Sequence, residues 1–412
     1  MRKKGMILAC AGVLALAAGG AVSAQQGGGE AGAVYWMTAD TMSGMGGMMG
    51  RRAGSMIGQM MRGGGMGGGT SRTLHLQLGS NRRPAGAPTA EHLPPAGLQA
   101  GQSLPLVSPE AARAVPEGPT DWTRNMERPK GRILIYWGCG EHARPGQPVV
   151  IDFESLSQGR LPPAFANLMA RGGGAMPPSP ARFATYGEWP NQRSPGRIQA
   201  NGSLVGEHLV RGNYSPDIRF TLAPGQDFLA PVVLTSNTAA PSGAVPLVWQ
   251  PVPGARGWLA TTMGGGANGD MVFWTSSEVQ AMAMGMDHMS DGEIARLVQQ
   301  RVLLPGTADR CTVPSEVARA GRGAMTTVTA FGGEFNFSNP VRPARAPAGW
   351  RPDWTVKLRT KSTYMGLLGM NMSEMGGGDE ERQGTSGDPN QPQPKKKKKS
   401  LFDKAIGGMI PH

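Results

Sequence analysis

The chain has 412 residues, including 63 glycines and 35 prolines, and its formal net charge is +12. Glycine and proline approach the fraction typical of low-complexity chains, but they are unevenly spread, and apolar residues cluster between about 130 and 360. The composition therefore excludes a chain without a core and predicts ordered blocks joined by loose connectors. The positive charge predicts attraction to anionic surfaces.

The first residues have the pattern of a secretory signal peptide. Arg2-Lys3-Lys4 precedes an apolar run over 6–18, and Val22-Ser23-Ala24 supplies the small residues that a signal peptidase needs. The run is too short to span a bilayer comfortably. Residues 1–24 are therefore predicted to be removed, leaving a periplasmic, secreted or cell-surface protein. Nucleic acid is then not an expected partner, and no transmembrane helix is expected after cleavage.

Residues 25–170 are predicted to form a first β-domain. Arg72 to Leu78 alternates apolar and polar side chains, which is typical of a strand with one buried face. Ile133 to Trp137 is continuously apolar and predicts a strand covered on both sides. Residues 42–69 are mostly glycine, methionine and arginine, and this composition predicts a disordered loop because it cannot build a packed core.

Residues 171–200 are predicted to be a linker and 201–370 a second β-domain. Within it, Val245-Pro246-Leu247-Val248-Trp249 is followed by Pro251-Val252-Pro253-Gly254-Ala255 and then by Trp258. A strand with a buried tryptophan, a proline-rich turn and an aromatic opening the next strand resemble a fibronectin type III-like β-sandwich over about 241–275. The resemblance implies a sandwich fold and leaves function open, because such sandwiches serve many roles.

Two helices are predicted to interrupt the second β-domain, as an insert over 277–320. Ser277-x-x-Gln280 is a possible cap for the first, and Ser290-Asp291-Gly292-Glu293 has the capping-box pattern for the second. Residues 371–412 are predicted to be a disordered basic tail. The predicted fold class is mainly β, with two sandwich-like β-domains, a small helical insertion and long disordered segments rich in glycine, methionine and proline.

Two cysteines remain once the predicted signal peptide, which contains Cys10, is removed. Cys139 and Cys311 form an even pair in an oxidising compartment, so a disulfide is the default expectation. The alternative takes Cys139-Gly140-Glu141-His142 as half of a metal site. No second pair with such spacing accompanies it.

Methionine is abundant and locally concentrated. Of the 26 methionines, several lie in 42–69, and a second group forms a Met/His string. Thioethers are soft ligands that suit Cu(I), and the string resembles the Met/His motifs of periplasmic copper-handling proteins. The alternative is that these flexible apolar side chains only pack. The candidate copper ligands are Met282, Met284, Met286, His288 and Met289.

Histidine and tryptophan supply weaker signals. Three of the six histidines follow glutamate, as Glu91-His92, Glu141-His142 and Glu207-His208. Neighbouring residues of a strand point to opposite faces, so a site would require these segments to converge, and surface positions are the simpler expectation. Trp122, Trp189 and Trp350 lie beside proline or charged residues and are the tryptophans expected to be exposed.

Catalytic motifs are missing from the sequence. It contains no Gly-x-Ser-x-Gly, His-Glu-x-x-His, P-loop or dinucleotide-binding glycine pattern. The expected function is therefore non-catalytic: an envelope-associated binding or structural protein without a cofactor, with a periplasmic copper-binding protein as the alternative. A protein partner is possible. Anionic envelope surfaces or polysaccharides are the expected partners of the basic tail, whose charge is concentrated in Lys395, Lys396, Lys397, Lys398 and Lys399.

Overall fold

A computed structural model describes residues 31–49, 69–109, 131–152, 154, 176–196, 198–281, 286, 289–347 and 349–370. The predicted signal peptide 1–24, the predicted tail 371–412 and its five lysines lie outside these ranges. Three β-sheets dominate the described residues, which confirms the predicted mainly-β fold.

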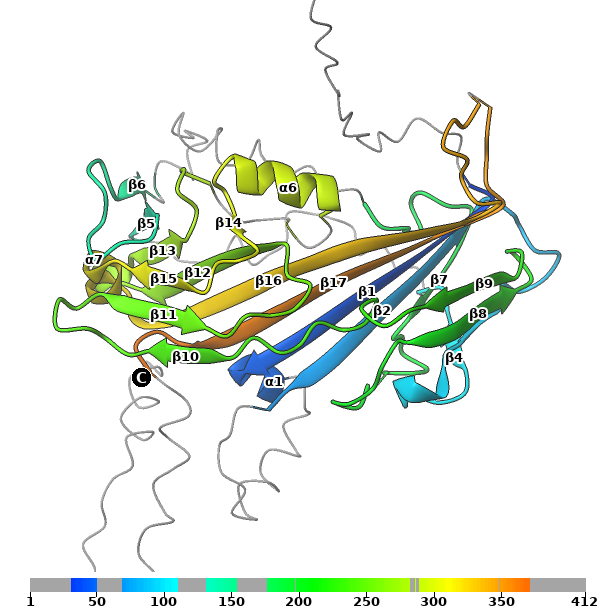
Figure 1. Cartoon of the computed structure of the whole chain (residues 1–412), viewed down its shortest axis with the longest axis horizontal. Coiled ribbons are helices and arrows are strands. Elements are labelled where there is room, and N and C mark those ends of the chain that lie inside the picture. Colours follow the sequence, from blue (N-terminus) through cyan, green and yellow to red (C-terminus); the bar gives the residue numbers. More distant parts are fainter. Residues whose placement is uncertain are drawn as a thin grey trace, which may run out of the picture.

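The largest sheet has ten strands and runs through most of the described chain. Its order is β6-β5-β13-β12-β16-β17-β1-β2-β7, and β14 pairs with β12 beside this path. Figure 1 shows the long strands β16, β17, β1 and β2 side by side along the length of the molecule. The strands are β1 (Ala33–Gly44), β2 (Ser71–Ser80), β5 (Arg132–Trp137), β6 (Val149–Asp152), β7 (Thr185–Trp189), β12 (Gly257–Gly265), β13 (Met271–Thr275), β14 (Leu304–Pro305), β16 (Arg322–Asn339) and β17 (Trp354–Leu367).

Two smaller sheets pack near the opposite ends of the long strands (Figure 1). One has the order β4-β3-β8-β9 and the other β10-β11-β15. Their strands are β3 (Ala90–Leu93), β4 (Leu104–Leu106), β8 (Gly206–Gly212), β9 (Ile218–Leu222), β10 (Leu234–Asn237), β11 (Val245–Trp249) and β15 (Arg310–Val313).

Each smaller sheet encloses its own core with the large sheet. In the first core, Tyr35 and Leu358 of the large sheet pack with Phe220 of β9. In the second core, Trp258 of β12 lies 5.2 Å, between ring centroids, from Trp249 of β11. Leu358 and Tyr364 lie an even number of residues apart on β17, so both cores occupy the same face of the large sheet. The arrangement is two sandwich-like halves that share one sheet.

The shared sheet crosses the predicted domain division. β1, from the first predicted domain, pairs in parallel with β17, from the second, along its whole length. β7 lies inside the predicted linker 171–200 and pairs with β2. The predicted loop 42–69 also begins later than expected, because Met42 to Gly44 continue β1 and Met45–Met49 form the short helix α1. The rest of that segment, 50–68, lies outside the described residues.

The predicted disulfide is confirmed. Cys139 follows β5 and Cys311 lies in β15; their sulfurs are bonded and their Cα atoms are 5.2 Å apart. The bond therefore links the large sheet to the three-stranded sheet. It closes a loop of 172 residues, which in the chain-entropy model stabilises the fold by roughly 4–5 kcal/mol.

Helix α6 (Asp291–Gln299) covers part of the other face of the large sheet (Figure 1). The predicted capping box is confirmed, because Ser290 and Glu293 exchange hydrogen bonds between side chain and backbone. Ile294 and Leu297 pack towards Leu259 and Phe331, which point away from the two sandwich cores. Other helical segments of the described residues include α7 (Ser315–Ala320) and the 3-10 turns η1 (Ala96–Leu98) and η2 (Ala267–Gly269).

The helix predicted to begin at Ser277 does not form over the described residues 277–281. The Ser277 hydroxyl accepts a hydrogen bond from the Val279 N–H and donates one to the Val279 carbonyl. This local turn uses the side chain that was expected to cap the helix. None of the helices in the described part of the chain is long and apolar enough to cross a membrane.

Candidate functional site

The candidate site is a groove on the face of the large sheet that neither smaller sheet covers, which we call the outer face. Strand alternation sends Asp40, Thr261, Thr327 and Lys361 to this face, while their chain neighbours enter the cores. The groove has a volume of about 320 Å³. Its lining comprises Asp40, Met42, Leu259, Thr261, Met286, Thr327, Thr329, Phe331, Lys361 and Thr363.

A β-bulge in β16 shapes one end of the groove. Phe331 pairs with Lys361, and Glu334 pairs with Arg359. The two β16 residues are three positions apart, whereas their partners on β17 are two positions apart, so β16 contains one extra residue. The extra residue brings both Phe331 and Glu334 to the outer face. Gly332 is required at the bulge, because a Cβ there would lie 2.2 Å from the Thr360 hydroxyl oxygen.

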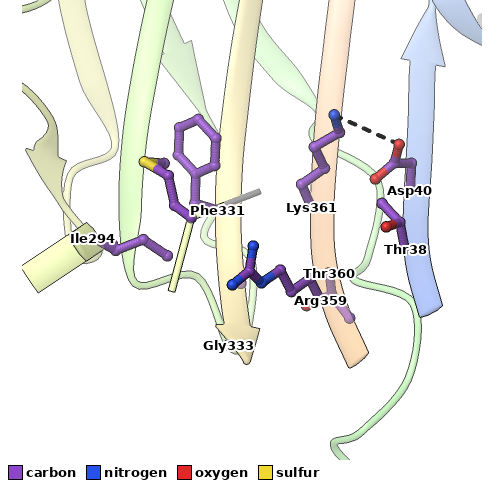
Figure 2. Close-up of a pocket in the computed structure, with 10 residues that line it drawn as sticks. Thr38, Asp40, Ile294, Phe331, Gly333, Arg359, Thr360 and Lys361 are labelled. Atoms are coloured by element: carbon purple, nitrogen blue, oxygen red, sulfur yellow. Dashed lines mark ion pairs between the residues drawn. The ribbon is translucent and has the colours of Figure 1, made fainter. Parts of the chain in front are cut away.

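The polar groups of the groove are one ion pair and four hydroxyls. Lys361 and Asp40 lie on neighbouring strands, and Figure 2 shows their side chains facing each other beside Phe331. The Nζ–Oδ2 distance is 3.6 Å, and the side chains are 21% and 24% exposed, so the pair is only partly hydrated. The hydroxyls bond to each other across strands, Thr261 to Thr327 at 2.7 Å and Thr329 to Thr363 at 3.2 Å.

A second charged group borders the groove on the bulge side. Glu334, only 9% exposed, accepts hydrogen bonds from Arg359 Nε at 2.7 Å and from Lys357 Nζ at 2.9 Å. Arg359 and Lys357 also lie over the Trp36 ring, at 4.6 and 5.3 Å from its centroid. Burial acts to raise the pKa of Glu334, but the charges of Lys357 and Arg359 and the hydrogen bonds from Lys357 and Asn336 outweigh it and lower the pKa.

In the sequence, Lys357, Arg359 and Lys361 alternate with Val356 and Leu358, which predicts one basic outward face of this strand. The network corrects that prediction. Lys357, Arg359 and Lys361 do alternate with buried Val356 and Leu358, but each cation is matched by Glu334 or Asp40. Burial, together with the charge of Arg359, lowers the pKa of Lys357, although Glu334 acts to raise it. The matching carboxylates come from other strands, β16 and β1. Only the fold shows that they lie beside the cations of β17.

The groove can bind a small molecule through apolar contacts and hydrogen bonds. Leu259, Phe331 and Met286 supply apolar walls. Lys361 and the threonine hydroxyls supply donors, and the volume of the groove lies within the range of small-ligand sites. Its single carboxylate, Asp40, is engaged with Lys361.

The predicted copper ligands are only partly described. Met286 lines the groove, and Met289 lines a smaller cavity of about 10 Å³ beside it, near Arg359 and Gly333. Both are buried with Ile294 of α6. Met282, Met284 and His288 lie outside the described residues, so this copper site stays a prediction. Within the described ranges, no three histidine, cysteine, aspartate or glutamate side chains are grouped to hold a metal ion.

Two of the three Glu-His pairs converge in the first sandwich core. His92 and His208 are fully buried on adjacent strands, with 2.8 Å between His92 Nε2 and His208 Nδ1. Their glutamates point the other way and pair with arginines of the same sheet. The third, His142, contacts Glu316 at the surface. The expectation of surface histidines is thus wrong for His92 and His208, because strand alternation turned each histidine inward.

The expected exposure of Trp189 is also wrong. Its side chain is 1% exposed, and its Nε1 donates to the Ser194 hydroxyl at 2.9 Å. Trp350 is partly exposed and lies under the Arg342 guanidinium. Trp122 lies outside the described residues.

Comparisons of the chain with protein-family models, with curated proteins and with solved structures find no match. A functional assignment therefore depends on the groove and its chemistry.

Proposed function

We propose that this is an envelope-associated, non-catalytic binding protein of the periplasm or cell exterior, and that the outer-face groove is its ligand site. The observation that supports the proposal is the partly hydrated Lys361–Asp40 pair beside apolar walls and four hydroxyls, in about 320 Å³. This chemistry suits a small amphipathic molecule with an anionic head group. The head group would bind Lys361, and the apolar part would lie against Leu259 and Phe331.

The groove proposal predicts that octanoate, used as a probe, binds the wild-type protein and that Lys361→Met weakens this binding at least tenfold. Methionine keeps the length and removes the cation, and a charged hydrogen bond contributes about 1.5–3 kcal/mol. Isothermal titration calorimetry measures the effect. Arg219→Met is the matched control, since it removes the cation of a similar 3.7 Å ion pair, with Glu207, away from the groove. Octanoate binding that is absent, or unchanged by Lys361→Met, would contradict the proposal.

The basic tail is proposed to attach the protein to anionic envelope surfaces. Lys395 to Lys399 are five adjacent like charges, and each contributes about 1 kcal/mol near an anionic surface. A mature protein ending at Pro394 should therefore sediment much less with phosphatidylglycerol vesicles than the full mature protein does. Added salt should weaken the binding of the full protein, because it screens the charges. Equal sedimentation of the two proteins would rule out the tail as the attachment to anionic surfaces.

The copper-binding alternative has one observation in its favour. Met42, from the first methionine-rich segment, and Met286, from the second, line the same groove although they are 244 positions apart in the sequence. The test of this alternative is the Cu(I) stoichiometry of a variant that replaces Met282, Met284, Met286, His288 and Met289 together.

The fibronectin type III-like resemblance of 241–275 also remains a proposal. It is supported by Trp249 and Trp258, which belong to two different sheets and pack against each other.

A further inference from the structure

Strand register places five methionines in one row across the outer face. Met263 on β12 lies directly opposite Met325 on β16. Met325 is diagonal to Met365 on β17, because Thr327 is the residue opposite Met365. Met365 is in turn diagonal to Met42 on β1, and Met271 on β13 is diagonal to Met263. We call these five residues the methionine row.

All five side chains lie on the same face as the groove. Met42 lines the groove itself. Met263, Met325 and Met365 are each two residues from a groove-lining threonine, and Met271 precedes the core residue Val272. Met263 and Met271 are 53% and 41% exposed, and the other three are partly exposed. Solvent can therefore reach the row.

Met42 and Met365 pack against Gly46 of α1, but packing does not account for the exposed Met263 and Met271. Strand positions favour β-branched and aromatic side chains, and methionine gains little stability where it stays in water. What the row concentrates is thioether sulfur. Met325 is central, since it has Met263 directly opposite and Met365 on the diagonal. Side chains at such positions are within reach of each other, and methionine has three rotatable bonds with which to adjust.

We propose that Met263, Met325 and Met365 bind a soft monovalent cation, Cu(I) or Ag(I). Three neutral thioethers match the softness of these ions and do not provide the negative charge that a hard divalent cation prefers. The inference depends on strand register and does not require the groove to bind any ligand. It concerns the same metal class as the copper alternative but different residues from 282–289.

Thioethers do not titrate, so the pH dependence of Cu(I) affinity distinguishes this site from others. Metal ligands such as cysteine or histidine must lose a proton, so their affinity falls as the pH falls. Cu(I) binding by the methionine row should keep the same affinity between pH 7.5 and pH 6. A site that included His288 should weaken across this range.

The test is Cu(I) competition with a chromogenic chelator on the full mature protein. The triple variant Met263→Leu, Met325→Leu, Met365→Leu conserves volume and should bind one Cu(I) fewer than the wild type. Met176→Leu is the matched control, because Met176 is 69% exposed and not part of the row; it should bind as the wild type does. Replacing the five candidate ligands in 282–289 should leave the equivalent bound by the row intact.

A measurement on the wild type tests the proposal even if the triple variant misfolds. With methionine labelled by ¹³C at the ε-methyl, Ag(I) should shift the signals of Met263, Met325 and Met365, assigned through single leucine variants. Unshifted signals for these three, or full Cu(I) stoichiometry in a folded triple variant, would overturn the proposal. If only the 282–289 variant loses Cu(I), the row proposal fails while the copper alternative stands.

Discussion

Replacing Glu334 by glutamine should lower the free energy of unfolding by about 3–5 kcal/mol, the range for breaking a buried ion pair. Glutamine keeps the shape but removes the carboxylate that Arg359 contacts at 2.7 Å and Lys357 at 2.9 Å. Arg359 is 5% exposed, so water cannot replace the lost charge. Chemical denaturation followed by tryptophan fluorescence measures the effect.

The control for Glu334 makes the same substitution at an exposed pair. Glu207 is 71% exposed and lies 3.7 Å from Arg219, so Glu207→Gln should unfold close to the wild type. Adding Arg359→Met to Glu334→Gln should recover part of the loss, because it removes the buried cation as well. If Glu334→Gln and Glu207→Gln have equal effects, the network does not stabilise the fold as described.

Local sequence patterns predicted the elements better than their partners. The run Ile133 to Trp137 was expected to be covered on both sides, and its alternate residues do enter two different clusters. The capping box at Ser290 was also correct, since capping involves only nearby residues. The pairing of β1 with β17 joins residues more than 300 positions apart, and no local pattern specifies such a partner.

The candidate site was harder to predict for the same reason. The alternation in β17 correctly placed Lys357 and Lys361 on one face, but their carboxylate partners come from β16 and β1. The bulge at Gly332 decides that Glu334 shares their face, and a pair of glycines does not by itself reveal a bulge. Likewise, the methionines of the row are dispersed in sequence and only register aligns them.

A buried series of hydrogen bonds through His208, His92 and Tyr35 predicts that the protein loses stability in mild acid. His208 Nε2 donates to the Leu204 carbonyl at 2.7 Å, so in the neutral ring Nδ1 must accept from His92 Nε2. His92 Nδ1 then accepts from the Tyr35 hydroxyl at 2.8 Å. One carbonyl thus fixes the tautomer of both histidines, and a second proton on His208 would place two donors against each other.

The direction of the pH effect follows from the pKa values. Burial lowers the pKa of His208 to about 4, although Leu204 and Asp227 act to raise it. Burial, with His208 nearby, also holds the pKa of His92 well below its usual value. Burial, with Tyr214 nearby, raises the pKa of Tyr35, which keeps that hydroxyl neutral. Between pH 6.5 and 4 the unfolded chain binds more protons than the fold, so stability falls as the pH falls.

His208 alone should therefore cost about 2 kcal/mol of stability between pH 7 and pH 5, and His92 should add to this. Urea unfolding at pH 7, 6 and 5 measures the change. In His208→Gln, stability at pH 7 should be lower, but its further decrease towards pH 5 should shrink by the His208 share. His142→Gln makes the same substitution at a side chain that is 69% exposed and lies outside this series of hydrogen bonds, so the acid loss due to His208 should persist in it. An undiminished acid loss in His208→Gln would show that other groups cause it, because that variant lacks the buried imidazole to which the loss is attributed.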